Sequence, residues 1–189
     1  GNFAAFEMDT KQKVKLIQNN TLQSSSKWIS NAGYVEEQED LFLTWTYPSR
    51  NASYQFTKMG IESLDITFED EIRSAYLVVQ QLSASPLHNI TDAYETYRIY
   101  NISIVPDSIN YGDIHLKVSN TWLDDKEIDI SSLTVLRDDD AGWEILNADI
   151  STKNNGGVNI KAEIRNSSTI AIVGKKVNNT SQDTGVSKQ

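Results

Sequence analysis

The stretch that decides the fold runs from Asn154 to Ile164 and reads NNGGVNIKAEI. From Val158 onward apolar and polar residues alternate, which is the period of a β-strand with one buried face. The Asn and Gly residues in front of that strand are those that a tight hairpin turn prefers. The run from Ala148 to Lys153 supplies the other arm, so the stretch predicts an antiparallel hairpin.

The same signal extends outward from this hairpin through most of the chain. Leu64, Ile66 and Phe68 alternate with polar residues, and further alternating or β-branched runs occupy residues 97–105 and 114–118. Ile170 to Val173 is a continuous apolar run, typical of a strand that is buried on both faces. No apolar run keeps helical spacing over three turns. The sequence therefore predicts an all-β fold, an antiparallel β-sandwich.

A cluster of acids lies between two predicted strands, at residues 133–137 and 143–146. We expect Asp138 to Gly142 to form a five-residue hairpin loop whose acids are solvated. Clustered carboxylates can also supply the oxygen ligands that calcium prefers. Asp138, Asp139 and Asp140 are therefore weak calcium candidates, although the run does not fit an EF-hand loop, and no other metal site is expected.

Composition limits the function. The chain has 189 residues, a formal net charge of −9 and no cysteine, which excludes disulfides and thiolate chemistry. The acidic surface disfavours nucleic acid as a partner, and the absence of an 18-residue apolar run predicts no membrane span within these residues. The two histidines are far apart and no nucleophile-elbow motif occurs. We therefore expect no enzymatic activity and no cofactor.

The regular pattern suggests three parts. These are an N-terminal strand-rich segment at 1–55, the sandwich at 56–176 and a polar tail at 177–189. Within the first part, residues 41–47 read as a strand and the acidic residues 36–40 as a polar separator. Residues 1–9 are apolar enough to act as a donor strand that completes the sheet of another copy. Its apolar positions are Phe3, Ala4, Ala5, Phe6 and Met8; the alternative is that Phe3 and Phe6 pack on their own domain.

Asparagine residues in the pattern Asn-x-Ser/Thr point to the compartment. This pattern accepts N-linked glycans on exported proteins, although Asn before a small polar residue also favours a tight turn. About three matches are expected by chance from the composition, and seven occur. Asn101 is the unusual one, because it falls inside a predicted strand and must face solvent to be modified. The seven acceptors are Asn19, Asn51, Asn89, Asn101, Asn166, Asn178 and Asn179.

Several short blocks occur in a fixed order between about Ile61 and Lys176. They read ITF at 66–68, IHLKV at 114–118, TWL at 121–123, GWEIL at 142–146 and IAIVG at 170–174. This order resembles the PGF-pre-PGF domain of archaeal cell-surface proteins. The resemblance implies an extracellular, cell-surface location.

Two functions are compatible with these features. The first is a non-enzymatic structural subunit of an archaeal extracellular assembly, either a cell-surface filament joined by strand complementation or a surface-layer component, with copies of itself as partners and N-linked glycans attached. The alternative is a cell-surface adhesion or glycan-binding module, stabilised by calcium, that uses aromatic residues such as Trp28, Trp45 and Tyr47.

Overall fold

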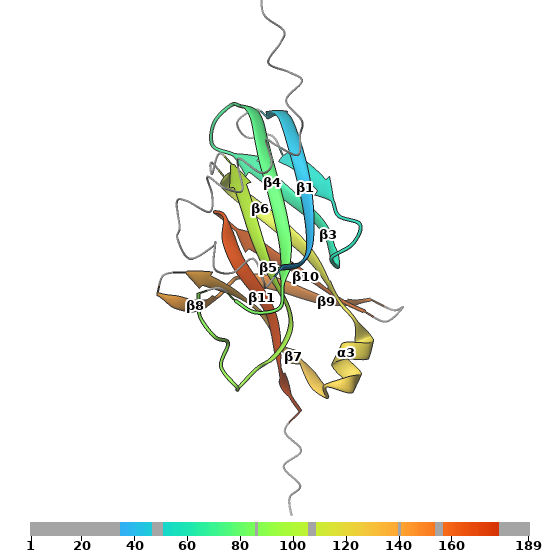
Figure 1. Cartoon of the computed structure of the whole chain (residues 1–189). Helices are drawn as coiled ribbons and strands as arrows, with labels where there is room; N and C mark the ends of the chain where they lie inside the picture. The colour runs from blue at the N-terminus through green and yellow to red at the C-terminus, as the bar shows by residue number, and fades with distance from the viewer. Residues whose placement is uncertain are drawn as a thin grey trace, which may run out of the picture.

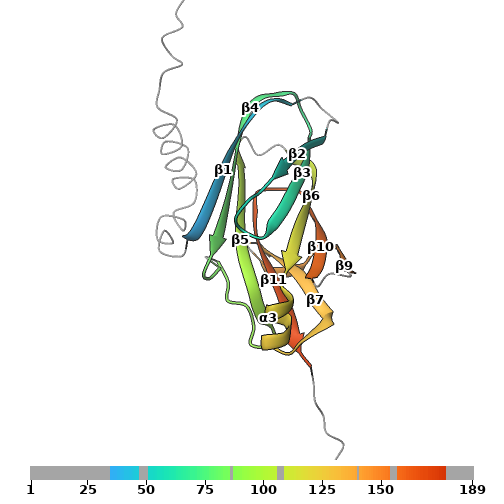
Figure 2. The same ribbon diagram turned by 90° about the vertical axis from the view of Figure 1, so that its right-hand side faces the viewer.

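The computed structural model describes residues 35–46, 51–85, 87–105, 109–139, 141–153 and 157–177. Two antiparallel sheets pack face to face, as the two views in Figures 1 and 2 show. The predicted all-β sandwich is therefore confirmed. The predicted donor residues, from Phe3 to Met8, lie outside the described residues.

Each sheet is assembled from strands that are distant in sequence. The six-stranded sheet has the order β1 (Val35–Thr46), β4 (Ile72–Leu82), β5 (Glu95–Val105), β11 (Ser168–Lys176), β7 (Ile128–Asp139) and β8 (Gly142–Ile145). The five-stranded sheet has the order β2 (Asn51–Gln55), β3 (Ile61–Phe68), β6 (Ile109–Val118), β10 (Gly157–Ile164) and β9 (Ala148–Lys153). A short helix, α3 (Asn120–Asp125), precedes β7.

The chain changes sheets at both sides of the sandwich. Strands β1 and β2 are consecutive in sequence and form the edges of the two sheets on one side, and β8 and β9 do so on the other. Because β1 pairs with β4 and β2 pairs with β3, both belong to the sandwich. The domain therefore extends to Val35, N-terminal of the predicted boundary at residue 56.

Two local predictions need correction. The acidic residues 36–40, predicted as a separator, are the first half of β1. The β7–β8 hairpin is tighter than predicted, because Asp139 pairs with Gly142 and Asp138 pairs with Trp143. These two pairs extend both strands, so the connection between Asp139 and Gly142 has two residues in place of the predicted five-residue loop. Asp138 therefore lies within the sheet.

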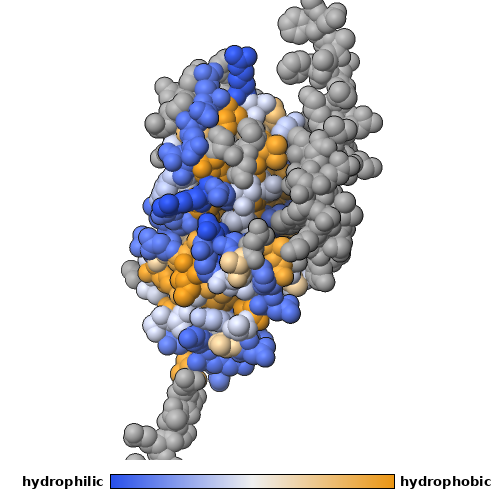
Figure 3. All heavy atoms as spheres, turned by 90° about the vertical axis from the view of Figure 1, so that its left-hand side faces the viewer, coloured by the Kyte–Doolittle hydropathy of each residue, from blue (hydrophilic) through white to orange (hydrophobic). Residues whose placement is uncertain are grey.

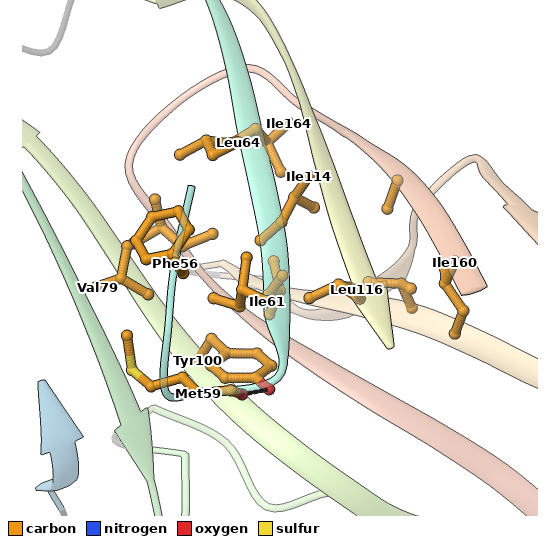
Figure 4. Close-up of a cluster of buried hydrophobic side chains, with 14 of the residues drawn as sticks. Phe56, Met59, Ile61, Leu64, Val79, Tyr100, Ile114, Leu116, Ile160 and Ile164 are labelled. Atoms are coloured by element: carbon orange, nitrogen blue, oxygen red, sulfur yellow. Dashed lines mark hydrogen bonds between the residues drawn. The ribbon is translucent and has the colours of Figure 1, made fainter. Parts of the chain in front are cut away.

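The core between the sheets follows the predicted alternation. Leu64 and Ile66 from β3, Ile114 and Leu116 from β6, and Ile160 from β10 are all buried there. Figure 4 shows several of these side chains converging on Val79 and Tyr100 from the opposite sheet. Each fully buried side chain of this size contributes roughly 1.5–3 kcal/mol to the free energy of unfolding. These five side chains therefore supply much of the stability.

Strand β11 is buried on both faces, as its continuous apolar run predicts. Ile170 and Ile172 belong to the core between the sheets. Ala171 and Val173 belong to a second, smaller cluster on the outer face of the six-stranded sheet. That cluster, here called the outer core, consists of Leu82, Ile99, Leu136, Ala171 and Val173, with Val35, Ile90, Tyr94 and Trp143 packed against it.

Tyr100 ties the loop between β2 and β3 to the centre of the sandwich. Its hydroxyl donates a hydrogen bond of 2.5 Å to the carbonyl oxygen of Met59, and Arg98 Nη1 donates a second one of 2.5 Å to the same oxygen. Gly60 adopts a φ of +72° beside them, a conformation that favours glycine. Figure 4 shows Tyr100 against Met59.

We predict that the wild-type protein loses stability at alkaline pH as Tyr100 ionises, and that Tyr100→Phe does not show this loss. Burial raises the pKa of Tyr100 to about 12 from its ordinary value of 10.0. A raised folded-state pKa stabilises the fold fully below pH 10, and that stability is lost as the pH rises through 12. Tyr100→Phe should lower the free energy of unfolding by about 1 kcal/mol near neutral pH. At high pH the free energy of unfolding of this variant should fall by roughly 2–3 kcal/mol less than that of the wild type.

Urea unfolding at a series of pH values measures this difference. Tyr76→Phe is the control, because Tyr76 is only partly buried on the outer face of β4, and it should follow the wild-type curve. Parallel curves for Tyr100→Phe and the wild type up to pH 12 would contradict the assignment.

Candidate functional site

The buried polar residues in the described part of the chain all lie in one row across the six-stranded sheet. Asn101 on β5 is opposite Thr169 on β11, and Thr169 is opposite Asp138 on β7. The row continues to Gln80 on β4 and Gln38 on β1. It faces outward, since Ile99 and Leu136, two residues away on their strands, belong to the outer core. We call Gln38, Gln80, Asn101, Thr169 and Asp138 the polar row.

Amide side chains link one half of the polar row. Asn101 Nδ2 donates to Gln80 Oε1 at 3.1 Å, and Gln80 Nε2 donates to Gln38 Oε1 at 2.7 Å. Gln38 Nε2 then donates to Asp40 Oδ1 at 2.7 Å. Cross-strand side-chain pairs of this kind stabilise sheets. The ladder ends at the exposed carboxylate of Asp40 on β1 and holds the outer face of β1, β4 and β5 in one register.

Asp138 anchors the loop between β4 and β5 at the other end of the row. Its carboxylate, which is fully buried, accepts hydrogen bonds from the Ser85 hydroxyl and from the backbone N–H of His88 at 3.1 Å. His88 Nδ1 lies 2.6 Å from Asp138 Oδ1. Trp143 Nε1 donates to the His88 carbonyl oxygen at 3.2 Å. Residues 83–94 are thereby held over the outer core, with Ile90 and Tyr94 packed on it.

This cluster resembles a catalytic triad in composition only. A nucleophilic serine donates its proton to histidine, whereas the Ser85 hydroxyl and the His88 ring both bond to the Asp138 carboxylate. The arrangement supports a structural role, in which the loop satisfies a buried charge.

The two described calcium candidates each bond to groups of the protein. Asp138 is engaged with Ser85 and His88, and Asp139 Oδ1 accepts from the backbone N–H of Ala141 at 2.8 Å. Asp140 lies outside the described residues. Within the described ranges, no three His, Cys, Asp or Glu side chains are grouped so that they could hold a metal ion.

We predict that Asp138→Ala releases the 83–94 loop. The change leaves the Ser85 hydroxyl and the His88 N–H without their buried acceptor, which should lower the free energy of unfolding by roughly 2–3 kcal/mol. Limited proteolysis should then cut between residues 83 and 94. Asp139→Ala is the matched control and should cost less than about 1 kcal/mol. Equal protease resistance in both variants would show that Asp138 does not hold the loop.

Two aromatic rings pack together on the same outer face of the six-stranded sheet. Phe42 on β1 and Tyr76 on β4 are opposite each other, with ring centroids 4.9 Å apart, and Val105 on β5 lies next in the row. Phe42 is 55% exposed. An exposed aromatic ring of this kind suits a contact with sugar or protein.

In the part of the chain that the structure describes, β1 is the long edge strand of the sandwich. It has 12 residues and, among the described strands, pairs only with β4. The other edges are shorter: β2 has five residues, β8 four and β9 six. Short edge strands protect a protein from unwanted strand pairing, whereas a long one presents a row of backbone donors and acceptors. We therefore identify the β1 edge as the candidate functional site.

The two halves of β1 differ in charge. Residues 36–40 hold four acids, and residues 41–46 read LFLTWT without a charge. Glu39 is used locally, since its carboxylate accepts from the Thr57 hydroxyl at 3.0 Å. Glu36 and Asp40 have neutral partners among the described residues, Gln81 and Gln38. Acids on an edge repel most partners, so only a chemically matched strand suits this one.

The opposite side of the sandwich offers a weaker edge. On the side where β8 lies, hydrophobic patches alternate with hydrophilic residues (Figure 3). Ile145 on β8 is 69% exposed, but β8 spans only Gly142 to Ile145. So short a strand gives a partner few backbone hydrogen bonds.

The structure separates the predicted glycan acceptors. Asn89, in the anchored loop, and Asn166, before β11, are exposed, and Asn51 is the first residue of β2. Asn101 faces outward from the sheet as required, yet it is 6% exposed and its Nδ2, the atom that would carry a glycan, bonds to Gln80. Asn101 is therefore no longer expected to be modified. Asn19, Asn178 and Asn179 lie outside the described residues.

We predict that mass spectrometry of the native protein finds glycans at Asn89 and Asn166 and an unmodified Asn101. The reason is access, because a glycan on Asn101 would break the amide ladder. A glycosylated Asn101 in folded protein would contradict this placement. Unmodified peptides at Asn89 and Asn166 would contradict the expected glycosylation itself.

Comparison with known proteins adds no relative. No model of a known protein family matches the chain, and no curated protein is significantly similar to it. In the part of the chain that the structure describes, no helix is long and apolar enough to cross a membrane. The resemblance to the PGF-pre-PGF domain therefore stays a prediction from sequence.

Proposed function

We propose that this protein is a non-enzymatic structural subunit of an archaeal extracellular assembly, in which copies of the chain join into a homopolymer by strand complementation. The observation that carries this proposal is the 12-residue β1 edge. In strand complementation, the main chain of one copy adds as a strand to the sheet edge of another. The accepting copy must therefore present a long open edge.

The rest of the sandwich is suited to this role. The outer face beside β1 is held in register by the amide ladder from Asn101 to Gln38, so the edge is presented by a rigid sheet. A preformed edge costs less ordering entropy when a strand is added. The exposed acceptor Asn166 precedes β11, which β4 and β5 separate from β1 in the six-stranded sheet, so a glycan there is compatible with an open edge.

A second candidate is the adhesion or glycan-binding module. The observation that favours it is the exposed ring of Phe42, which packs on the partly buried ring of Tyr76. Trp28 and Tyr47 lie outside the described residues, and only the backbone of Trp45 is described, as part of β1. The two candidates differ in oligomeric state, because a module acts as a monomer.

We predict that the full-length protein forms filaments or sheets visible by negative-stain microscopy and that deletion of residues 1–9 abolishes them. The deletion removes the proposed donor strand and leaves β1 in place. Deletion of residues 181–189, a tail segment of equal length, is the control and should leave assembly unchanged. Polymers that survive the loss of residues 1–9 would contradict the donor assignment, and a monomer under all conditions would favour the adhesion module.

A further inference from the structure

We infer that the open edge of β1 accepts residues 5–15 of a second copy as an antiparallel strand, with Met8 opposite Leu43 and Lys11 opposite Asp40. This inference rests on the proposed function and names its acceptor, its donor and their register. The acceptor edge is described by the structure; the donor lies outside the described residues and is known from its sequence.

The charges of the two segments match when they run antiparallel. Along the donor, FAAFEM at 3–8 is followed by KQKVK at 11–15, so an apolar part precedes a basic part. Along β1 the order is reversed, with the acids at 36–40 before LFLTWT at 41–46. Antiparallel pairing therefore places the apolar parts together and the basic part against the acids.

Strand alternation selects the register. Phe6, Met8 and Val14 are at even positions of the donor, whereas Lys11, Lys13 and Lys15 are at odd ones. On β1, Leu41 packs against the core between the sheets, and Phe42 lies on the outer face with Tyr76. Cross-strand neighbours point to the same face, so a register that points the lysines to the outer face places them opposite even positions of β1.

One register then gives the best pairs. With Met8 opposite Leu43, Phe6 is opposite Trp45 and Lys11 is opposite Asp40. No pair is assigned to Glu36, because the register of β1 shifts between Val35 and Glu37. A shift of two residues in one direction places Asp9 opposite Asp40, which sets two like charges together. A shift in the other direction places Lys11 opposite Phe42. Opposite charges across strands stabilise a sheet and like charges destabilise it.

A second copy suits this pairing better than the chain's own N-terminus. Pairing within one chain would make a hairpin whose connection runs from residue 16 to residue 35. Ordinary hairpin loops have about two to five residues. A donor from another copy needs no such connection, and each copy then offers one donor and one acceptor. Such a head-to-tail contact adds one copy after another, and it gives a filament unless the rotation per copy closes a ring.

Cysteine crosslinking tests the register, because the natural chain has no cysteine. The register places Lys13 opposite Gln38, a pair that belongs neither to the charge pair nor to the apolar pairs. Full-length Lys13→Cys and Gln38→Cys proteins are mixed under assembly conditions, oxidised and run on a non-reducing gel. We expect a disulfide-linked dimer, because directly opposite Cβ atoms are about 4.5–5.5 Å apart, within reach of a disulfide after small adjustments.

The matched control mixes Lys13→Cys with Phe42→Cys, four residues away along β1, at roughly 13 Å. It should give at least about tenfold less dimer. Polymers that form with no excess of the Lys13–Gln38 dimer overturn this inference and leave the proposed function standing. A double variant that crosslinks only within single chains overturns it as well. If microscopy shows no polymers of the wild-type protein, both the inference and the proposed function fail.

Discussion

The burial of β11 on both faces is the constraint on which the rest of the structure depends. A sheet in a sandwich needs cover on its inner face only, but Ala171 and Val173 also bring apolar surface to the outer face. That surface has to be covered by the chain itself. The 83–94 loop provides the cover through Ile90 and Tyr94, and the buried Asp138 carboxylate and Trp143 hold the loop in place.

The outer core also explains the polar row beside it. Where the covered part of the sheet ends, outward-facing positions are buried but lie next to the surface, so polar side chains there need partners within the protein. Asp138 finds them in the loop, and Asn101 finds one in Gln80. The same pairing removes Asn101 from solvent. A single packing requirement thus fixes the loop, the amide ladder and the accessibility of one predicted acceptor.

The far end of the row meets the longest edge among the described strands. There β1 has a described partner strand on one side only, and it divides into an acidic half and an uncharged apolar half. Charged residues on an edge strand normally disfavour the addition of unrelated strands. Because one half of β1 is acidic and the other is apolar, only a strand with the complementary order of basic and apolar residues pairs along its whole length. The edge is therefore selective.

Local alternation in the sequence by itself determined most strands and the sandwich class, because a period of two is a property of neighbouring residues. It also determined which residues of β3, β6 and β10 face inward. The continuous apolar run likewise determined that Ile170 to Val173 are buried on both faces. These local patterns did not reveal that Asp138 and Asn101 are buried or that residues 36–40 form a strand. Those outcomes were decided by tertiary structure: the partners Ser85, Gln80 and the strand β4 are distant in sequence, and only strand order and register bring them opposite one another.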